Sequence, residues 1–161
     1  MLYHFSDKPD IDQFVPKASR LGRPVVWAIT AEYAFLYLFP RDCPRILLWA
    51  TAETTQPDRY RWLGPATRVA YVERAWIDRI ANTDLYRYNL PEAPFDALDE
   101  VGMHVSEKTV TPNSVIAISD LPQRLVAENV ELRPVASLKP LTSLWDSSLH
   151  VSGIRMRNMQ D

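Results

Sequence analysis

Prolines and glycines constrain this chain more than any other feature of its sequence. Thirteen prolines interrupt its 161 residues, while its four glycines stand singly. Because proline cannot continue a helix or donate to a β-ladder, the sequence predicts short helices and strands joined by ordered loops. Dinucleotide-binding turns and P-loops need clustered glycines, since the backbone there turns sharply and approaches phosphate closely. Neither of these two motifs can be written anywhere in this chain.

Length and cysteine content favour a single domain over residues 1–161. A chain of this size buries roughly 68–70% of its unfolded surface on folding, which stabilises it without disulfides or metals. Cys43 is the only cysteine, and His4, His104 and His150 stand too far apart in sequence to form a metal-ligand pair at zinc spacing. We therefore expect neither an internal disulfide nor a metal site.

The charge balance and the hydropathy of the sequence indicate which partners and which cellular location to expect. With 18 Lys and Arg against 20 Asp and Glu, the formal net charge is −2, so the chain lacks the basic character usual for sequence-independent binding to nucleic acid. Its longest apolar runs, at residues 25–29, 34–39 and 46–52, are far shorter than the ~20 residues that span a bilayer. The first residues show neither a basic nor an apolar signal region. We expect a cytoplasmic protein with no membrane partner.

Periodicity in the sequence predicts many short strands and few helices. Alternating or continuous apolar runs indicate strands at residues 2–6, 25–29, 46–50, 68–73, 85–90, 102–110, 114–118 and 131–135. Helical spacing and caps indicate helices at residues 30–39 and 76–81, from 120 onward, and at 138–152 with Gly153 as the stop signal, whereas 53–61 reads as an exposed loop. Strands and helices mixed without regular βα alternation are typical of an α+β domain, here with a central, mainly antiparallel or split sheet.

Two groups of side chains near the start of the chain are candidates for binding. His4 lies on the first expected strand beside Ser6, and Tyr33 and Tyr37 stand one turn apart on one face of the first expected helix. A lone histidine near an N-terminus is usually structural or solvated, and aromatics at helical spacing usually belong to a core. Both the structural and the binding interpretation remain open at this level.

Glu107 is the candidate carboxylate. If the strand pleat continues through it, Glu107 shares a face with Met103 and Val105, where a carboxylate is unfavourable unless it lines a cleft. If the strand ends earlier, the side chain points into water. The sequence leaves both arrangements open.

The order of these segments resembles the ADP-ribosyltransferase superfamily. A histidine on an opening strand at residues 2–6 is followed by a strand at 25–30, aromatics at 33–37, Ser-Glu at 106–107 and Val-Thr-Pro at 110–112. The resemblance covers residues 1–118 and implies that superfamily's fold. The chain is also similar to an uncharacterised family of small bacterial proteins that open with Leu-Tyr-His-Phe-Ser.

The resemblance implies a role for each candidate residue. His4, with Ser6 beside it, would match the histidine that hydrogen-bonds a ribose hydroxyl of NAD, and Tyr33 or Tyr37 the aromatic that packs on nicotinamide. Glu107 would match the glutamate that binds the 2′-hydroxyl of the nicotinamide ribose. Cleavage of an N-glycosidic bond develops an oxocarbenium ion, and a preorganised carboxylate lowers that barrier. The expected function is an ADP-ribosyltransferase-like protein that binds NAD or a related nucleotide, with the acceptor open.

Val105 stands where arginine-modifying members of the superfamily carry a second glutamate, so arginine is not the expected acceptor. A copy of the fold without catalytic activity is one alternative. Another is a non-catalytic nucleotide or RNA binding module, because arginines lie beside aromatics at residues 59–62 and 86–88. A third is a nucleophilic hydrolase that uses Cys43 between Arg41 and Arg45, although a lone cysteine is usually inert.

Overall fold

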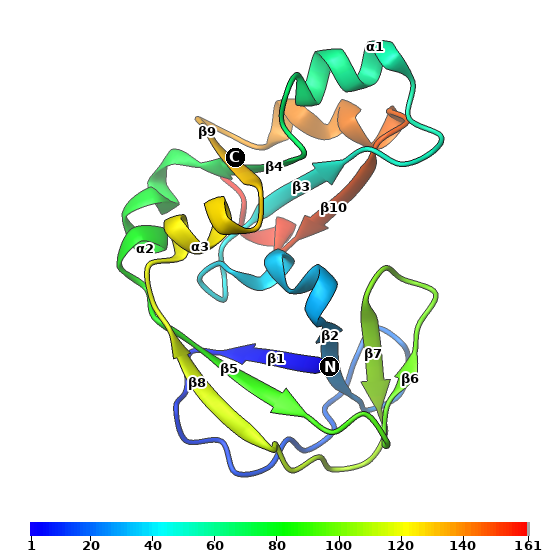
Figure 1. Cartoon of the computed structure of the whole chain (residues 1–161), viewed down its shortest axis with the longest axis vertical. Coiled ribbons are helices and arrows are strands. Elements are labelled where there is room, and N and C mark those ends of the chain that lie inside the picture. The colour runs from blue at the N-terminus through cyan, green and yellow to red at the C-terminus, as the bar shows by residue number, and fades with distance from the viewer. Residues whose placement is uncertain (161) are drawn as a thin grey trace. The chain divides into compact units, whose positions relative to one another are not determined.

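Strands in two sheets, with short helices beside them, make up the fold (Figure 1). This computed structural model describes residues 1–160 and confirms the predicted α+β class with antiparallel sheet and short helices. The residues group into two compact units. Unit 1 consists of Met1–Leu38 and Asp84–Ser119, and unit 2 consists of Phe39–Thr83 and the chain from Asp120 onward. The expectation that they form one domain stays a prediction.

Unit 1 is built on a six-stranded sheet in the order β6-β7-β2-β1-β5-β8, in which every neighbouring pair is antiparallel. The elements are β1 (Leu2–Ser6), β2 (Val26–Thr30), the 3₁₀ helix η1 (Ala31–Tyr37), β5 (Leu85–Leu90), β6 (Asp96–Ala97), β7 (Met103–Ser106) and β8 (Ser114–Ile118). The strands predicted at 2–6, 85–90 and 114–118 are confirmed. The strand predicted at 102–110 ends at Ser106.

One hydrophobic core cluster of unit 1 lies on one face of this sheet. Leu2, Ala28 and Tyr88 point to this face, and loop residues Phe14 and Phe95 pack on them. Since residues paired across antiparallel strands share a face, the register Leu2↔Leu90 and Ala28↔His104 extends the same face to β5 and β7. The opposite face includes Ile29 and Met103, which are also paired.

The sheet of unit 1 splits beside β1. β1 pairs with β5 along all five of its residues, whereas its pairing with β2 is confined to Leu2↔Thr30 and Tyr3↔Ile29. Beyond Tyr3, the imidazole of His4 bridges the two strands, because its Nδ1 lies 2.9 Å from the carbonyl oxygen of Trp27. A side chain thus takes the place of backbone pairing at this point.

Unit 2 is built on a four-stranded sheet in the order β10-β3-β4-β9, in which only the β4–β9 pair is parallel. Its strands are β3 (Arg45–Trp49), β4 (Arg68–Glu73), β9 (Val130–Val135) and β10 (His150–Ile154). Its helices and helical turns are α1 (Gln56–Asp58), η2 (Arg59–Leu63), η3 (Arg74–Trp76), α2 (Ile77–Asn82), α3 (Leu121–Ala127), η4 (Lys139–Asp146) and η5 (Met156–Asn158). The predicted strand at 68–73 and the capped helix after Asp120 are confirmed.

Two local predictions for unit 2 are wrong. The expected exposed loop at 53–61 contains α1 and the start of η2, and the expected helix at 138–152 is the 3₁₀ helix η4 followed by β10. Gly153 therefore lies inside a strand and does not end a helix. The ring of Trp145 covers it so closely that a Cβ at Gly153 would lie 2.7 Å from Trp145 Cζ2. Pairing of β10 with the distant β3 decides the conformation of this segment.

Candidate functional site

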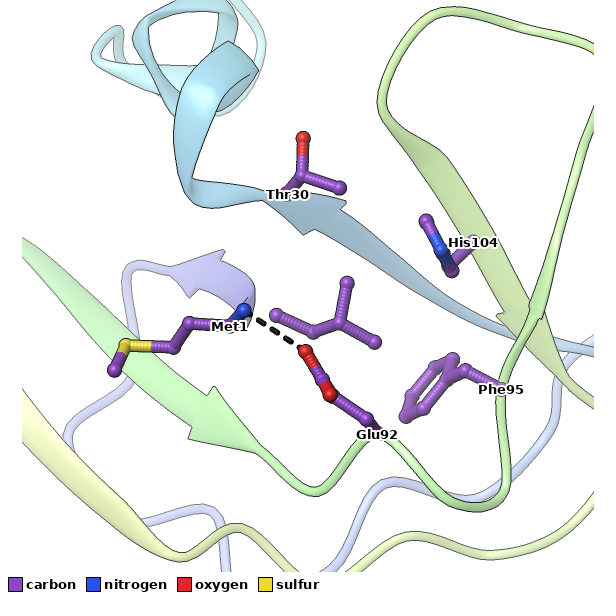
Figure 2. A pocket seen from close by; sticks show the side chains of 6 residues that line it. Met1, Thr30, Glu92, Phe95 and His104 are labelled. Atoms are coloured by element: carbon purple, nitrogen blue, oxygen red, sulfur yellow. Dashed lines mark hydrogen bonds and ion pairs between the residues drawn. The ribbon is translucent and has the colours of Figure 1, made fainter.

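A shallow pocket of about 240 Å³ lies in unit 1, on the face of the sheet that carries the core (Figure 2). Met1 and Leu2 lie at the start of β1, Thr30 at the end of β2, His104 on β7, and Glu92 and Phe95 in the loop between β5 and β6; together they line the pocket. Ligand pockets usually measure about 300–1,000 Å³. This pocket therefore suits one ring or one sugar rather than a whole dinucleotide.

One wall of the pocket is apolar. Leu2 is almost fully buried and fixes the floor, and the Phe95 ring beside it is 9% exposed. The register Leu2↔Thr30 sets the start of β1 against the end of β2, so this wall is held by the sheet. An aromatic ring on a rigid support is a suitable platform for a planar group.

Charged and polar groups stand around that wall. The Glu92 carboxylate accepts a hydrogen bond from the amino group of Met1 at 2.9 Å (Figure 2). This hydrogen bond and the charge of the amino group, with a further contribution from His104, lower the pKa of Glu92, so it is ionised at neutral pH. His104 is half-buried, with Nδ1 3.4 Å from the Gly102 carbonyl oxygen. The pocket thus offers a carboxylate and an imidazole next to an aromatic ring.

Thr30 contributes its surface but not its hydroxyl. Its Oγ1 is buried and makes no hydrogen bond within the described residues. Because this atom is out of reach of water, it does not face the open volume of the pocket, and Figure 2 shows it turned away from Glu92. The Thr30 backbone is held by its N–H, which donates to the Gly102 carbonyl at 3.0 Å.

His4 lies on the same face of the sheet as the pocket, although it does not line it. Alternation along β1 puts His4 and Leu2 on one face, and Leu2 lines the pocket. The His4 ring contacts the Phe14 ring at a centroid distance of 4.6 Å, and its Nδ1 donates to Trp27. Ser6 follows on the same face and is buried, with its Oγ accepting from the Lys8 N–H at 3.1 Å.

Tyr33 and Tyr37 lie elsewhere. Both are half-buried on η1, and Tyr37 donates to the Met103 sulfur at 3.6 Å. Tyr33 packs so closely on Gly102 that a Cβ added to this glycine would lie 2.8 Å from the Cβ of Tyr33. Because Met103 belongs to the face opposite His4, the structure of unit 1 does not bring these tyrosines together with His4.

Glu107 follows the last residue of β7 and takes the solvent-exposed arrangement. Its side chain is 61% exposed, and its Oε2 lies 3.2 Å from Arg23 Nη1. β2 lies between β1, which carries His4, and β7, which precedes Glu107. Glu107 does not line the pocket, but it follows His104 by three residues along the chain.

The structure also shows the surroundings of the arginine-aromatic segments and of Cys43, on which the alternative interpretations depend. Tyr88 is buried and donates to the Lys8 carbonyl, while the Arg87 guanidinium lies 4.1 Å from the Tyr3 ring centre, so both serve packing. In the other arginine-aromatic segment, residues 59–62, Tyr60 is 85% exposed and lies at the surface. Burial raises the pKa of the fully buried Cys43 thiol to about 12, which disfavours a nucleophilic role.

The described residues form neither a metal-binding cluster nor a membrane-spanning helix. Among residues 1–160, no three His, Cys, Asp or Glu side chains gather in a way that could hold a metal ion. Within the same range, no helix has the length and apolar character required to cross a bilayer.

Sequence reasoning missed the pocket itself. Glu92 and Phe95 lie in the short loop between β5 and β6, which contains Pro91 and Pro94; these prolines are a signal for an ordered loop but not for a ligand. His104 carries no local signal, because only its strand pairing brings it to the pocket. The pocket depends on contacts between segments distant in sequence.

Comparison with known proteins gives one match. The sequence profile of a family of unknown function, DUF6886, matches residues 3–159. Searches of the curated proteins and of the solved structures each returned no match.

Proposed function

The chain belongs to DUF6886, and we propose that it binds NAD or a related nucleotide through unit 1, with the nicotinamide-ribose end in the pocket beside Phe95. The observation that carries this proposal is the position of the pocket on the sheet. It shares a face with His4 and begins two residues away along β1. The order of strands and motifs that resembles the ADP-ribosyltransferase superfamily supports the same ligand class.

Charge determines which end of the ligand fits. Unit 1 contains six Lys and Arg against ten Asp and Glu, a formal charge of −4, and one of these carboxylates, Glu92, lines the pocket beside the Met1 amino group. A negative unit repels phosphates and attracts a cation. The oxidised nicotinamide ring is a cation of single-ring size, so it suits the pocket better than the diphosphate does.

Each side chain then has a physical role. The Phe95 ring stacks on the planar nicotinamide, and a cation held against an aromatic face gains roughly 0.5–2 kcal/mol, with the larger values at desolvated sites. The Glu92 carboxylate accepts hydrogen bonds from ribose hydroxyls. His104, which lines another side of the pocket from Glu92, provides a second polar partner (Figure 2).

Calorimetry of the full chain with NAD tests the proposal. We expect binding at millimolar NAD or tighter, weakened about tenfold by Phe95→Ala, which corresponds to ~1.4 kcal/mol. Glu100→Ala is the matched control, because this carboxylate is also in unit 1 and exposed but pairs with Arg20 outside the pocket. Nicotinamide riboside should compete, and free phosphate should not. No heat of binding at millimolar NAD would refute the proposal.

The same samples test cleavage of the nicotinamide bond. The resemblance assigns this step to Glu107, although its exposed side chain pairs with Arg23 and does not line the pocket. A catalytic role for Glu107 predicts that Glu107→Gln retains the affinity for NAD and lowers nicotinamide release by roughly 10²–10³. Equal release from both proteins would exclude Glu107 from the reaction while leaving the binding proposal intact.

A further inference from the structure

The outer edge of β8 is the most unusual surface of the described residues. β8 (Ser114–Ile118) ends the six-stranded sheet and pairs only with β5, as Figure 1 shows from its outermost position in that sheet. The backbone groups on its other side meet no other strand. An edge strand of this kind is a template for pairing with a further strand.

The side chains of β8 do not protect this edge. Val115 is 41% exposed and Ile116 is 42% exposed, and no charged residue occurs between Thr111 and Ser119. Edge strands in soluble proteins usually carry lysine, proline or inward-pointing charges that prevent such pairing. None of these devices is present within β8.

Two other sheet edges of the same molecule do carry protection. β9 contains Glu131, Arg133 and Pro134, of which the proline has no N–H to donate. β6 is only two residues long and includes Asp96. β8 has no protection of either kind.

We propose that β8 pairs with β8 of a second copy of this chain, antiparallel about a two-fold axis at Ile116. In this register Ile116 meets Ile116 of the partner subunit, and Val115 meets Ala117 of the partner subunit. The pairing joins two six-stranded sheets into one continuous sheet, which is the arrangement that β-strand addition produces. It buries the exposed apolar side chains that the free edge leaves in water.

The neutral edge is compatible with self-pairing. Because residues 111–119 are uncharged, two copies meet without like charges opposite each other. A two-fold contact also closes on itself and does not propagate into fibres. Stable interfaces use roughly 20–30 residues per side, so a five-residue strand predicts a weak dimer that forms as concentration rises.

Sedimentation equilibrium of the full chain, from about 1 µM to about 1 mM, tests the proposal. We expect a reversible monomer–dimer equilibrium that Ile116→Lys weakens at least about tenfold, because two ammonium groups then meet at the axis. Val126→Lys is the matched control, since Val126 is 63% exposed but lies on α3. Circular dichroism verifies that each variant is folded. A chain that stays monomeric to 1 mM overturns the proposal, and so does a dimer that both variants leave unchanged.

A cross-linking variant tests the register without adding charge. Residues opposite each other in an antiparallel pair have Cβ atoms roughly 4.5–5.5 Å apart, so Ile116→Cys should oxidise to a covalent dimer many times faster than Val126→Cys. The natural Cys43 is buried and does not compete. Equal rates for the two cysteine variants would rule out pairing at Ile116.

Discussion

His4 shows how one side chain can have a structural task beside an expected binding role. Its imidazole donates to the Trp27 carbonyl where β1 and β2 separate, and its ring packs on Phe14. The sequence predicted its strand and its face, because alternation along residues 2–6 is local. It did not predict the bond to Trp27, which depends on how two strands 23 residues apart diverge. The exposed position of Glu107 likewise depends on where β7 ends.

At the scale of single residues, His150 makes the stability of the folded chain depend on pH. Burial lowers the pKa of His150 below its usual 6.5, and its ring stacks on Trp49 at 4.3 Å. The folded chain therefore resists protonation, whereas the unfolded chain takes up a proton as pH falls through about 6.5. Stability due to this group is complete above pH 6.5 and is lost below it.

We accordingly expect His150→Phe, which retains a ring against Trp49, to lose less stability than the natural chain between about pH 7.5 and about pH 5. Urea unfolding at the two pH values measures this difference. An identical loss in both proteins would show that His150 does not titrate differently in the folded state.

At the scale of elements, local patterns predicted strands well and the last helix poorly. Residues 68–73 contain a continuous apolar run and residues 85–90 alternate, and the two segments form β4 and β5. The spacing of apolar residues at 138–152 fits a helix, yet residues 150–154 form β10, because they pair with β3 about a hundred residues earlier. Such a partner is not visible in a local window of sequence.

Glu73 connects several elements of unit 2. It is fully buried at the end of β4, and its carboxylate accepts from the backbone N–H groups of Leu138 at 3.2 Å and of Gln160 at 3.0 Å. Leaving a buried donor without a partner costs roughly 1–3 kcal/mol. We expect Glu73→Ala to lower the free energy of unfolding by at least about 2 kcal/mol.

Chemical denaturation of Glu73→Ala measures this effect, and Glu53→Ala is its control, because Glu53 is exposed and hydrogen-bonds only to nearby Thr51. If both substitutions change stability equally, Glu73 does not hold these elements together.

At the scale of the whole molecule, the chain passes between the two compact units three times, at residues 38–39, 83–84 and 119–120. Neither unit is a continuous stretch of sequence, so the sequence-based expectation of one domain predicts that both units unfold together. Trp27 is the only tryptophan of unit 1, and Trp49 belongs to unit 2. With fluorinated tryptophan, the NMR signals of these two residues should disappear at the same urea concentration. Separate midpoints would mean two independently folding domains.

The most direct test of the proposed function is an NMR titration of the isotopically labelled full chain with NAD. The account predicts saturable shifts centred on the backbone signals of Leu2, Phe95 and His104, which lie around the pocket. Nicotinamide riboside should reproduce these shifts. Unchanged spectra at millimolar NAD, or shifts confined to unit 2, would contradict nucleotide binding at this pocket.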